Sequence, residues 1–304
     1  MMRRGEESGT LMQHESQYRR LAQPLGRREL LRRAAGLTLI AAAVGVAGAE
    51  YTRTIEPGWV EITSVHVRMP GMAPAFNGYR IAQISDLHLG DWLTPAQLAQ
   101  VVRRVNGLGA DLIAVTGDFI TSHASLHAQD LITTLRDLHA PDGVAGILGN
   151  HDHWSSAAVI RRVIAESGML DLNNEVNTLQ RGGALLHIAG VDDIWERKAR
   201  LDDVLAAMPR EGAAVLLAHE PDFADTSAAS RRFGLQISGH SHGGQIIAPF
   251  IGPLRLPLYA LKYPLGRYLV GGMTQYTNRG IGMLQPHVRL NCRPEITVFT
   301  LEAG

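Results

Sequence analysis

The sequence predicts an α/β domain of largely parallel, buried strands that follows a separate N-terminal segment. Short apolar stretches that end in polar residues alternate along the chain with helical stretches, which is the pattern of β-α-β units. These short stretches are mostly apolar throughout, as expected for strands that are covered on both faces. Of the 304 residues 45% are hydrophobic and 19% are charged, which allows a substantial core.

The first 49 residues have the order of an export signal. Eight arginines and four glutamates within residues 1–33 precede the uncharged run AAGLTLIAAAVGVAGA at 34–49. The pair Arg27 and Arg28 in RRELLR resembles the twin-arginine signature of folded-protein export in bacteria, which implies the twin-arginine export machinery as a partner. The other interpretation is a disordered arginine-rich tail before a buried helix.

Sixteen apolar residues fall below the roughly 20 that span a bilayer comfortably, which favours a signal peptide over a transmembrane helix. Ala47-Gly48-Ala49 offers a small-residue cleavage site, and a missed cleavage would leave an N-terminal anchor. We therefore expect residues 1–49 to be a twin-arginine-type signal peptide or anchor, and residues 50–304 to form the folded domain. The expected location is the periplasm or the outer face of the cytoplasmic membrane.

The domain begins with polar and apolar alternation in WVEITSVHVRMP, which is typical of an amphipathic strand. Three repeats of strand, polar tip and helix follow, with strands in YRIAQISDLHLG, ADLIAVTGDFI and GVAGILGNHDHW. The first of the three helices is predicted to begin after Thr94 as its N-cap, with Pro95 in its first turn and Gly107 near its end. Further strands are expected near 185–190 and 213–218, with a helix in LDDVLAAMP between them, and RPEITVFTLEAG closes the domain as a strand.

The stretch 249–268, PFIGPLRLPLYALKYPLGRY, is interrupted by prolines and cannot form a regular helix. It is either a lid or groove for acyl chains or membrane contact, or a long loop packed on the core. In the first case Arg255, Lys262 and Arg267 are expected to meet phosphate.

Polar side chains follow five of the strands, where parallel strands place their carboxyl ends at one edge of a sheet. These candidate ligands are Asp86, His88, Asp118, Asn150, His219, His240 and His242. Carboxylate, imidazole and amide groups suit Mn²⁺, Fe²⁺, Co²⁺ or Zn²⁺, whereas a single cysteine, Cys292, excludes a thiolate cage. Seven candidates are too many for one ion and about right for two.

Two divalent ions would give these residues a shared chemistry. A bridging carboxylate holds such ions roughly 3.5 to 4 Å apart, and a water between them loses a proton near neutral pH. The surplus positive charge attracts a phosphate group and stabilises an in-line displacement at phosphorus. The composition therefore predicts a hydrolase in which two divalent metals activate a bridging hydroxide.

The ordered blocks D-x-H, GD, GNHD, H and GHxH, from Asp86 to His242, resemble the calcineurin-like metallophosphoesterase family. The stretch NCRPEI at 291–296 resembles its twin-arginine-exported phosphodiesterase branch. The resemblance implies an α/β sandwich of two mixed β-sheets flanked by helices, in four layers αββα. It also implies a dinuclear metal centre and a phosphoric ester hydrolase.

Carried over position by position, the resemblance assigns Asp86, His88 and His242 to one metal. It assigns Asn150, His219 and His240 to the other, with Asp118 as the bridge. His151 matches the general acid of the family, or the donor that stabilises its transition state, and Asp152 would orient its imidazole through a hydrogen bond.

The expected substrate is a phosphate ester, most simply a phosphodiester at the cell envelope that is lipid-linked or a sugar nucleotide. One alternative is a pyrophosphatase of the UDP-2,3-diacylglucosamine type, whose cytoplasm-facing site conflicts with export. Another is a non-catalytic scaffold that keeps the fold. The formal net charge of zero argues against nucleic acid as a partner.

Overall fold

The structure is a computed structural model that describes residues 26–304. The chain forms two compact units, which divide between Glu50 and Tyr51. The arginine-rich beginning of the predicted signal, residues 1–25, lies outside the described residues. The role of residues 1–49 in export stays a prediction.

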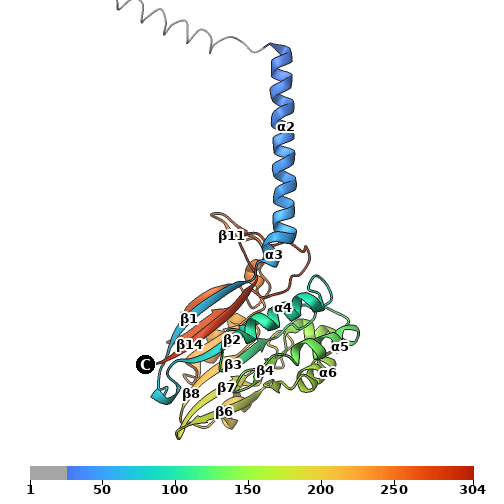
Figure 1. Ribbon diagram of the computed structural model, residues 1–304. Coiled ribbons are helices and arrows are strands. Elements are labelled where there is room, and N and C mark those ends of the chain that lie inside the picture. The colour runs from blue at the N-terminus through green and yellow to red at the C-terminus, as the bar shows by residue number, and fades with distance from the viewer. Residues whose placement is uncertain (1–25) are drawn as a thin grey trace, which may run out of the picture. The chain divides into compact units, whose positions relative to one another are not determined.

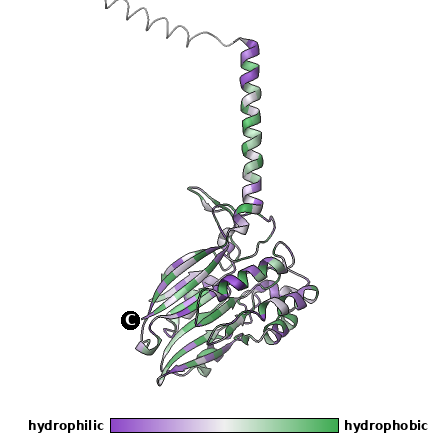
Figure 2. Cartoon of the chain, in the orientation of Figure 1, coloured by the Kyte–Doolittle hydropathy of each residue, from purple (hydrophilic) through white to green (hydrophobic). Residues whose placement is uncertain are grey.

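In the N-terminal unit the described residues form one helix, α2 (Arg27–Glu50), none of whose side chains is buried. Its 24 residues span about 36 Å at 1.5 Å per residue, which exceeds the roughly 30 Å hydrocarbon core of a bilayer. Figure 2 shows a hydrophobic middle between hydrophilic ends. The helical segment Arg27–Gly58 is long and apolar enough to cross a membrane, a test that signal sequences also pass.

The second unit contains two six-stranded mixed sheets (Figure 1). In spatial order the first sheet consists of β1 (Glu61–Met69), β14 (Glu295–Ala303), β2 (Tyr79–Ile84), β3 (Leu112–Thr116), β4 (Val144–Ile147) and β5 (Leu170–Asp171). The second consists of β12 (Gly266–Val270), β13 (Met273–Thr277), β9 (Leu235–Ser238), β8 (Ala213–Leu217), β7 (Ala184–Gly190) and β6 (Glu175–Arg181). Strands β2 to β5 pair in parallel, as do β7, β8, β9 and β13.

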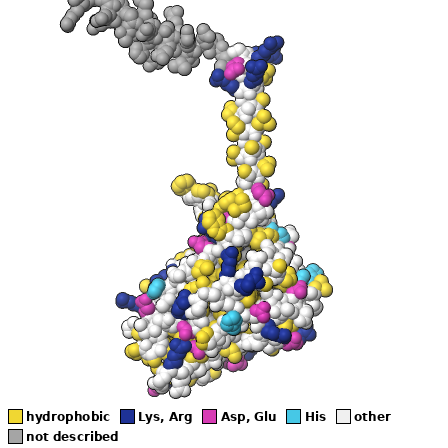
Figure 3. Space-filling model, in the orientation of Figure 1, with side chains coloured by type: hydrophobic (Ala, Val, Ile, Leu, Met, Phe, Trp, Pro, Cys, Tyr) yellow, Lys and Arg dark blue, Asp and Glu magenta, His cyan; other side chains and the backbone are white. Residues whose placement is uncertain are grey.

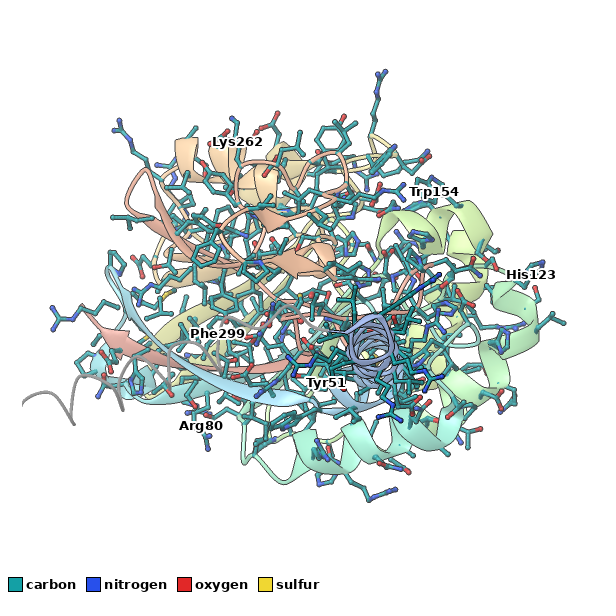
Figure 4. The ribbon with its side chains drawn as sticks, turned by 90° about the horizontal axis from the view of Figure 1, so that it is seen from above. Tyr51, Arg80, His123, Trp154, Lys262 and Phe299 are labelled. Carbon is teal, nitrogen blue, oxygen red and sulfur yellow. The ribbon has the colours of Figure 1, made fainter. Side chains whose placement is uncertain are left out.

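Helices cover the outer face of each sheet. The longer ones, which pack on the first sheet, are α4 (Pro95–Asn106), α5 (Ala124–Leu135) and α6 (Asn150–Glu166). The two that pack on the second sheet are α7 (Leu201–Ala207) and α8 (Ala224–Ala229). A third apolar core fills the space between the sheets and includes Phe299, which Figure 4 labels among the strands. These four layers confirm the predicted αββα sandwich.

Short helical turns complete the domain: Tyr51–Ile55, α3 (Glu56–Gly58), Pro74–Phe76, Pro221–Phe223 and His242–Gly244. The predicted start of α4 is confirmed in detail. The Thr94 side chain accepts from the backbone N–H of Gln97, and the Gln97 side chain accepts from the backbone N–H of Thr94. Gly107 follows the last residue of the helix.

The strand registers place the ends of several strands at one edge of the sandwich. Strands β1 and β14 run in parallel from Glu61 and Glu295, and Thr297 of the antiparallel β14 pairs with Gln83 near the carboxyl end of β2. The beginning of β1 therefore lies at the same edge as the carboxyl ends of β2, β3 and β4. We call this the carboxyl edge.

The proline-rich stretch 249–268 contains no helix, as predicted. A short hairpin forms around its beginning from two strands of two residues each, β10 (Ile247–Ala248) and β11 (Gly252–Pro253). The stretch ends in strand β12, which the sequence analysis did not anticipate because β12 alternates between half-buried and exposed residues.

We expect Phe299→Ala to lower the free energy of unfolding by about 3 to 5 kcal/mol, because a fully buried ring would leave a cavity between the sheets. The ring also contacts Tyr276 edge to face, at 5.3 Å between centroids. Leu269→Ala is the control, since Leu269 is 77% exposed and its loss should change the free energy by no more than about 0.5 kcal/mol. Chemical denaturation measures both, and equal losses would contradict the assignment of this core.

Candidate metal centre

All seven predicted ligands lie at the carboxyl edge, and all are buried. Asp86 and His88 follow β2, Asp118 follows β3, and Asn150 begins α6 directly after the turn from β4. On the second sheet His219 follows β8, and His240 and His242 follow β9. The convergence predicted from strand ends is therefore present across both sheets.

The side chains form two groups of three whose ligand atoms lie within 4.8 Å of one another. The first group is Asp86, His88 and His242. Nε2 of His242 lies 3.0 Å from Nε2 of His88 and 3.4 Å from Oδ1 of Asp86. Burial lowers the pKa of His88 to about 3 and the pKa of His242 well below its usual value, so both imidazoles are neutral at pH 7. The Nε2 atoms of the two rings face each other beside a carboxylate, and these three side chains form a suitable set of ligands for a cation.

The second group is Asp118, His219 and His240. Backbone carbonyls fix both imidazoles: Nδ1 of His219 donates to Thr116 O at 2.7 Å, and Nε2 of His240 donates to Leu258 O at 2.8 Å. Nδ1 of His240 is then left with a lone pair, and Nε2 of His219 becomes a lone-pair donor once its proton leaves. Burial lowers the pKa of His240 to about 3, which keeps that ring neutral.

Asp118 lies between the two groups. Its Oδ2 is 3.4 Å from Nε2 of His88 in the first group and 3.2 Å from Nε2 of His219 in the second. Burial alone would raise the pKa of Asp118, but the neighbouring imidazoles of His219 and His151 hold it well below its usual value. A charged carboxylate in this position has the geometry of a bridge between two cations.

Asn150 is a further candidate metal ligand at this edge. Its Oδ1 is buried without a hydrogen-bond partner among the described residues, although buried amide oxygens almost always have one. The carboxamide lines the same cavity as Asp118 and His240. A cation would satisfy this oxygen.

Strained backbone accompanies the ligands. Five of the seven have φ between 47° and 70°, in the left-handed region that non-glycine residues rarely adopt; they are Asp86, His88, Asp118, His240 and His242. Each such residue costs on the order of 1 kcal/mol or more, so the fold must hold them in place. Backbone bonds do so, since Asp86 N donates to Gly117 O and His88 N to Asp118 O, both at 3.0 Å.

Two glycines allow the strand ends to approach one another. A Cβ at Gly239 would collide with the side chains of Ser85 and Asp86, and a Cβ at Gly149 would collide with Asp118 and lie 2.7 Å from Nε2 of His219. These glycines are therefore required by close packing around the ligands.

His151 lies at the edge of the cavity and is half-buried. Its backbone N–H donates to Asp118 Oδ1 at 3.0 Å, and its Nδ1 lies 3.2 Å from Thr121 O. Its ring contacts His88 edge to face, at 4.9 Å between centroids. The residue thus faces the ligands without belonging to either group of three.

The predicted hydrogen bond from Asp152 to the His151 imidazole is wrong. The Asp152 carboxylate is fully buried and accepts instead from the backbone N–H groups of Phe119 at 2.9 Å and Gly149 at 3.0 Å. Asp152 is the third residue of α6, where a carboxylate naturally caps the N–H group that precedes the helix. It positions the turns that carry Asp118 and Asn150, and its catalytic role stays a prediction.

A cavity of about 610 Å³ opens over the two groups. Asp118, Asn150, His151, His240 and His242 line its polar side. The opposite wall is apolar and consists of Ile246, Leu254, Leu256, Pro257, Leu258, Leu284 and Pro286. The centre therefore opens into a cavity lined by both polar ligands and apolar side chains.

An aromatic wall was missed by the sequence analysis. Trp154 packs on His151 with 4.8 Å between ring centroids and on Trp195 with 5.3 Å, and Trp195 reaches His240 at 5.7 Å. The buried carboxylate of Glu220, next to His219, holds this loop by accepting from the N–H groups of Ile194 and Trp195. The pair HE directly after a buried strand was the available signal for this link.

Of the three basic residues expected to meet phosphate, only Arg255 lines the cavity. Lys262 forms an ion pair with Asp225, and Arg267 donates to the backbone oxygen of His66 at 3.0 Å. Figure 4 labels Lys262 and Trp154 at separate places on the rim of the domain, and His123, which precedes α5, at a third. The expectation is wrong for Lys262 and Arg267 because both are held by partners on the surface.

Comparison with known proteins agrees with this geometry. Residues 79–244 match the sequence profile of the calcineurin-like phosphoesterase family. The chain belongs to this family. The two groups of three correspond to the dinuclear divalent metal centre of these metallophosphoesterases, which are phosphoric ester hydrolases.

Three relatives illustrate the family. The metallophosphoesterase YkuE of Bacillus subtilis is 36% identical over 282 residues, which cover 92% of this chain and 98% of YkuE. The phosphodiesterase YaeI of Escherichia coli is 26% identical over 258 residues, which cover 84% of this chain and 93% of YaeI. A transmembrane protein with metallophosphoesterase domain from Bos taurus is 29% identical over 260 residues, which cover 80% of this chain and 57% of that protein.

We expect this metallophosphoesterase to bind Mn²⁺ more weakly as the pH falls from 8 to 5.5. Burial raises the pKa of Asp86 to about 6, so protons occupy that ligand below pH 6. Burial would lower the pKa of His219, but Asp118 raises it well above its usual value, so a proton must also leave that ring. Affinity should change by roughly tenfold per pH unit for each proton displaced. Titration calorimetry in two buffers of different ionisation enthalpy measures affinity and proton release, and a pH-independent affinity would contradict this ligand set.

Proposed function

We propose that this chain is a phosphodiesterase of the cell envelope, with residues 1–49 as an export signal or N-terminal anchor and residues 50–304 as the enzyme. One observation carries the proposal: a single buried carboxylate, Asp118, lies within 3.4 Å of an imidazole nitrogen in each of two ligand groups, beneath one cavity. The phosphodiesterase name of YaeI supports a diester as the substrate class. The apolar helix α2 supports a location at the membrane.

Asp86, His88 and His242 would hold one ion, and Asn150, His219 and His240 the other, with Asp118 between them. When bound, the two ions supply the positive charge that polarises the phosphoryl oxygens and lowers the pKa of a water molecule. The chain's own residues bind and orient these groups from strained turns that glycines keep close. Preorganised donors of this kind need no rearrangement as charge develops in the reaction.

His151 would donate a proton to the departing ester oxygen. When the ring is protonated, Nδ1–H donates to Thr121 O, and Nε2–H remains for the substrate. Trp154, packed on the same ring, excludes water from one side. The backbone N–H of His151 also holds Asp118, so one residue would serve both the bridge and the proton transfer.

The apolar wall of the cavity favours a diester with a lipid or other apolar substituent over a free sugar nucleotide. Five aliphatic side chains and two prolines line the cavity, whereas Arg255 is the one cationic side chain among its lining residues. A small polar ester would leave this wall in contact with water, at a cost in binding free energy.

The test of the mechanism is His151→Ala. We expect hydrolysis of a bis-aryl phosphate to fall by roughly 10² or more, the usual range for loss of a general acid, while the metal content measured by elemental analysis stays near two ions per chain. His139→Ala is the matched control, because His139 is an exposed loop histidine whose ring nitrogen Nδ1 lies 3.1 Å from the backbone oxygen of Asp137, away from the metal ligands. Unchanged turnover in His151→Ala, or less than about one ion per chain in the wild type after Mn²⁺ loading, would refute the assignment.

The test of location is the double change Arg27→Lys and Arg28→Lys. The twin-arginine machinery reads the arginine pair itself, so we expect export to stop while the charge of the segment is kept. Cell fractionation with protease protection measures where the chain resides. Export of the double variant at the wild-type level would exclude the twin-arginine route.

A further inference from the structure

An exposed apolar hairpin projects at β10 and β11 (Figures 1 and 3). Its tip residues are Phe250, which is 109% exposed relative to a reference peptide, and Ile251, which is 78% exposed. Leu254, directly after β11, is also exposed. Exposure of large apolar side chains to water is energetically unfavourable. A projecting tip made of them indicates a surface that contacts a membrane or another molecule.

The hairpin lies beside the point where the chain enters the domain. Ile247 N donates to Leu290 O, and Arg289 N donates to Thr52 O, both at 2.9 Å. The Asn291 side chain donates to Ile247 O at 3.1 Å. Three strips of chain, the hairpin, residues 289–291 and the entry segment 51–59, are therefore adjacent, and the entry segment is the first part of the domain after the apolar helix.

The entry segment has the composition of a membrane interface. Trp59 is 50% exposed, and the guanidinium carbon of Arg293 lies 3.6 Å from the centre of its ring. Ile55 is 53% exposed, and Arg53 is exposed as well. Tryptophan is enriched at the interface between membrane and water, where its amphipathic ring lies at the level of the headgroups. Arginine suits the same interface, because its stem is apolar and its guanidinium can reach the headgroups.

The metal centre opens at the same end of the molecule. The entry segment leads into β1 at the carboxyl edge, where the ligands lie. Ile246 and Leu254, at the two ends of the hairpin, also line the cavity over the metal centre. The apolar wall of the cavity is thus continuous with the apolar hairpin.

We propose that the hairpin and the entry segment form a membrane face, with Phe250 and Ile251 inserted among the acyl chains of a phospholipid bilayer and Trp59 at its interface. Arg53, Arg255 and Arg293 would meet the phosphates of the headgroups. The cavity then opens toward the lipid, so the substrate is a phosphodiester that carries a lipid and is taken from the membrane surface. This inference rests on the proposed function, because it needs α2 as an anchor and a diester as the substrate.

The membrane face can be tested in the full, uncleaved chain reconstituted into vesicles of phosphatidylcholine and phosphatidylglycerol. A cysteine replaces Ile251 and is labelled with an environment-sensitive fluorophore; the native Cys292 is fully buried and leaves the label specific. Lipids with a nitroxide on the acyl chain then quench only labels within the bilayer. We expect quenching several times stronger at position 251 than at a control position.

Leu269→Cys is the matched control. Leu269 is as exposed as Ile251, at 77%, but it pairs with Thr274, whose other partner is Leu235 at the beginning of β9. It therefore lies at the end of the second sheet opposite the carboxyl edge. Equal quenching at both positions, or none at position 251 in protein that floats with the vesicles, would overturn the proposal. A blue-shifted label at 251 without lipid quenching would also overturn it and would indicate a second protein copy on the hairpin.

Turnover by the same labelled protein separates this inference from the proposed function. Bis-aryl phosphate is soluble, and its hydrolysis needs only the metal centre. Quenching at 251 without turnover would support the membrane face while refuting the phosphodiesterase. Turnover without quenching at 251 would support the phosphodiesterase and overturn the membrane face.

Discussion

The fully buried carboxylate of Asp118 is the interaction on which the rest of this structure depends. It lies between imidazoles contributed by both sheets, so the two sheets must bring their strand ends to within hydrogen-bonding distance of one point. That requirement explains the glycines at 149 and 239, where any side chain would collide with a ligand. It also explains the left-handed backbone at five ligands, because each turn must reverse directly after a buried strand.

The electrostatics of the site follow from the same constraint. Seven buried polar side chains would normally be costly, since burial opposes charge and leaves lone pairs without partners. Here burial keeps His88, His240 and His242 neutral, while Asp118 remains charged. Three neutral imidazoles beside a charged carboxylate favour a cation, whereas the His219 ring, whose pKa Asp118 raises well above its usual value, must lose its proton before it can bind one.

The sequence alone predicted most of the fold and the candidate ligands, for a definite physical reason. Polar residues that directly follow buried strands lie at the carboxyl ends of those strands, and parallel strands place their carboxyl ends at one edge of the sheet. The N-cap of α4 was equally predictable from the sequence, because Thr94 and Gln97 interact within one helical turn. Strands β6 and β12 were not, because edge strands carry partly exposed residues at both faces.

Long-range partners account for the remaining errors. Asp152 is next to His151 in sequence, but successive helical residues point in different directions, and its carboxylate caps two N–H groups instead. Lys262 and Arg267 found partners about 40 and 200 residues away along the chain. Trp195 meets Trp154 through a loop with no periodicity that could have signalled it.

Glu56 links the beginning of the second unit to the metal centre. Its buried carboxylate accepts from Cys292 N at 2.6 Å, and the Cys292 thiol lies 3.1 Å from the backbone oxygen of His242. The short helical turns that begin at Tyr51 thus support the metal centre through contacts of Glu56 and Cys292. A peptidase that cuts after Ala49 would leave these contacts intact. The metal centre would then be the same with or without residues 1–49.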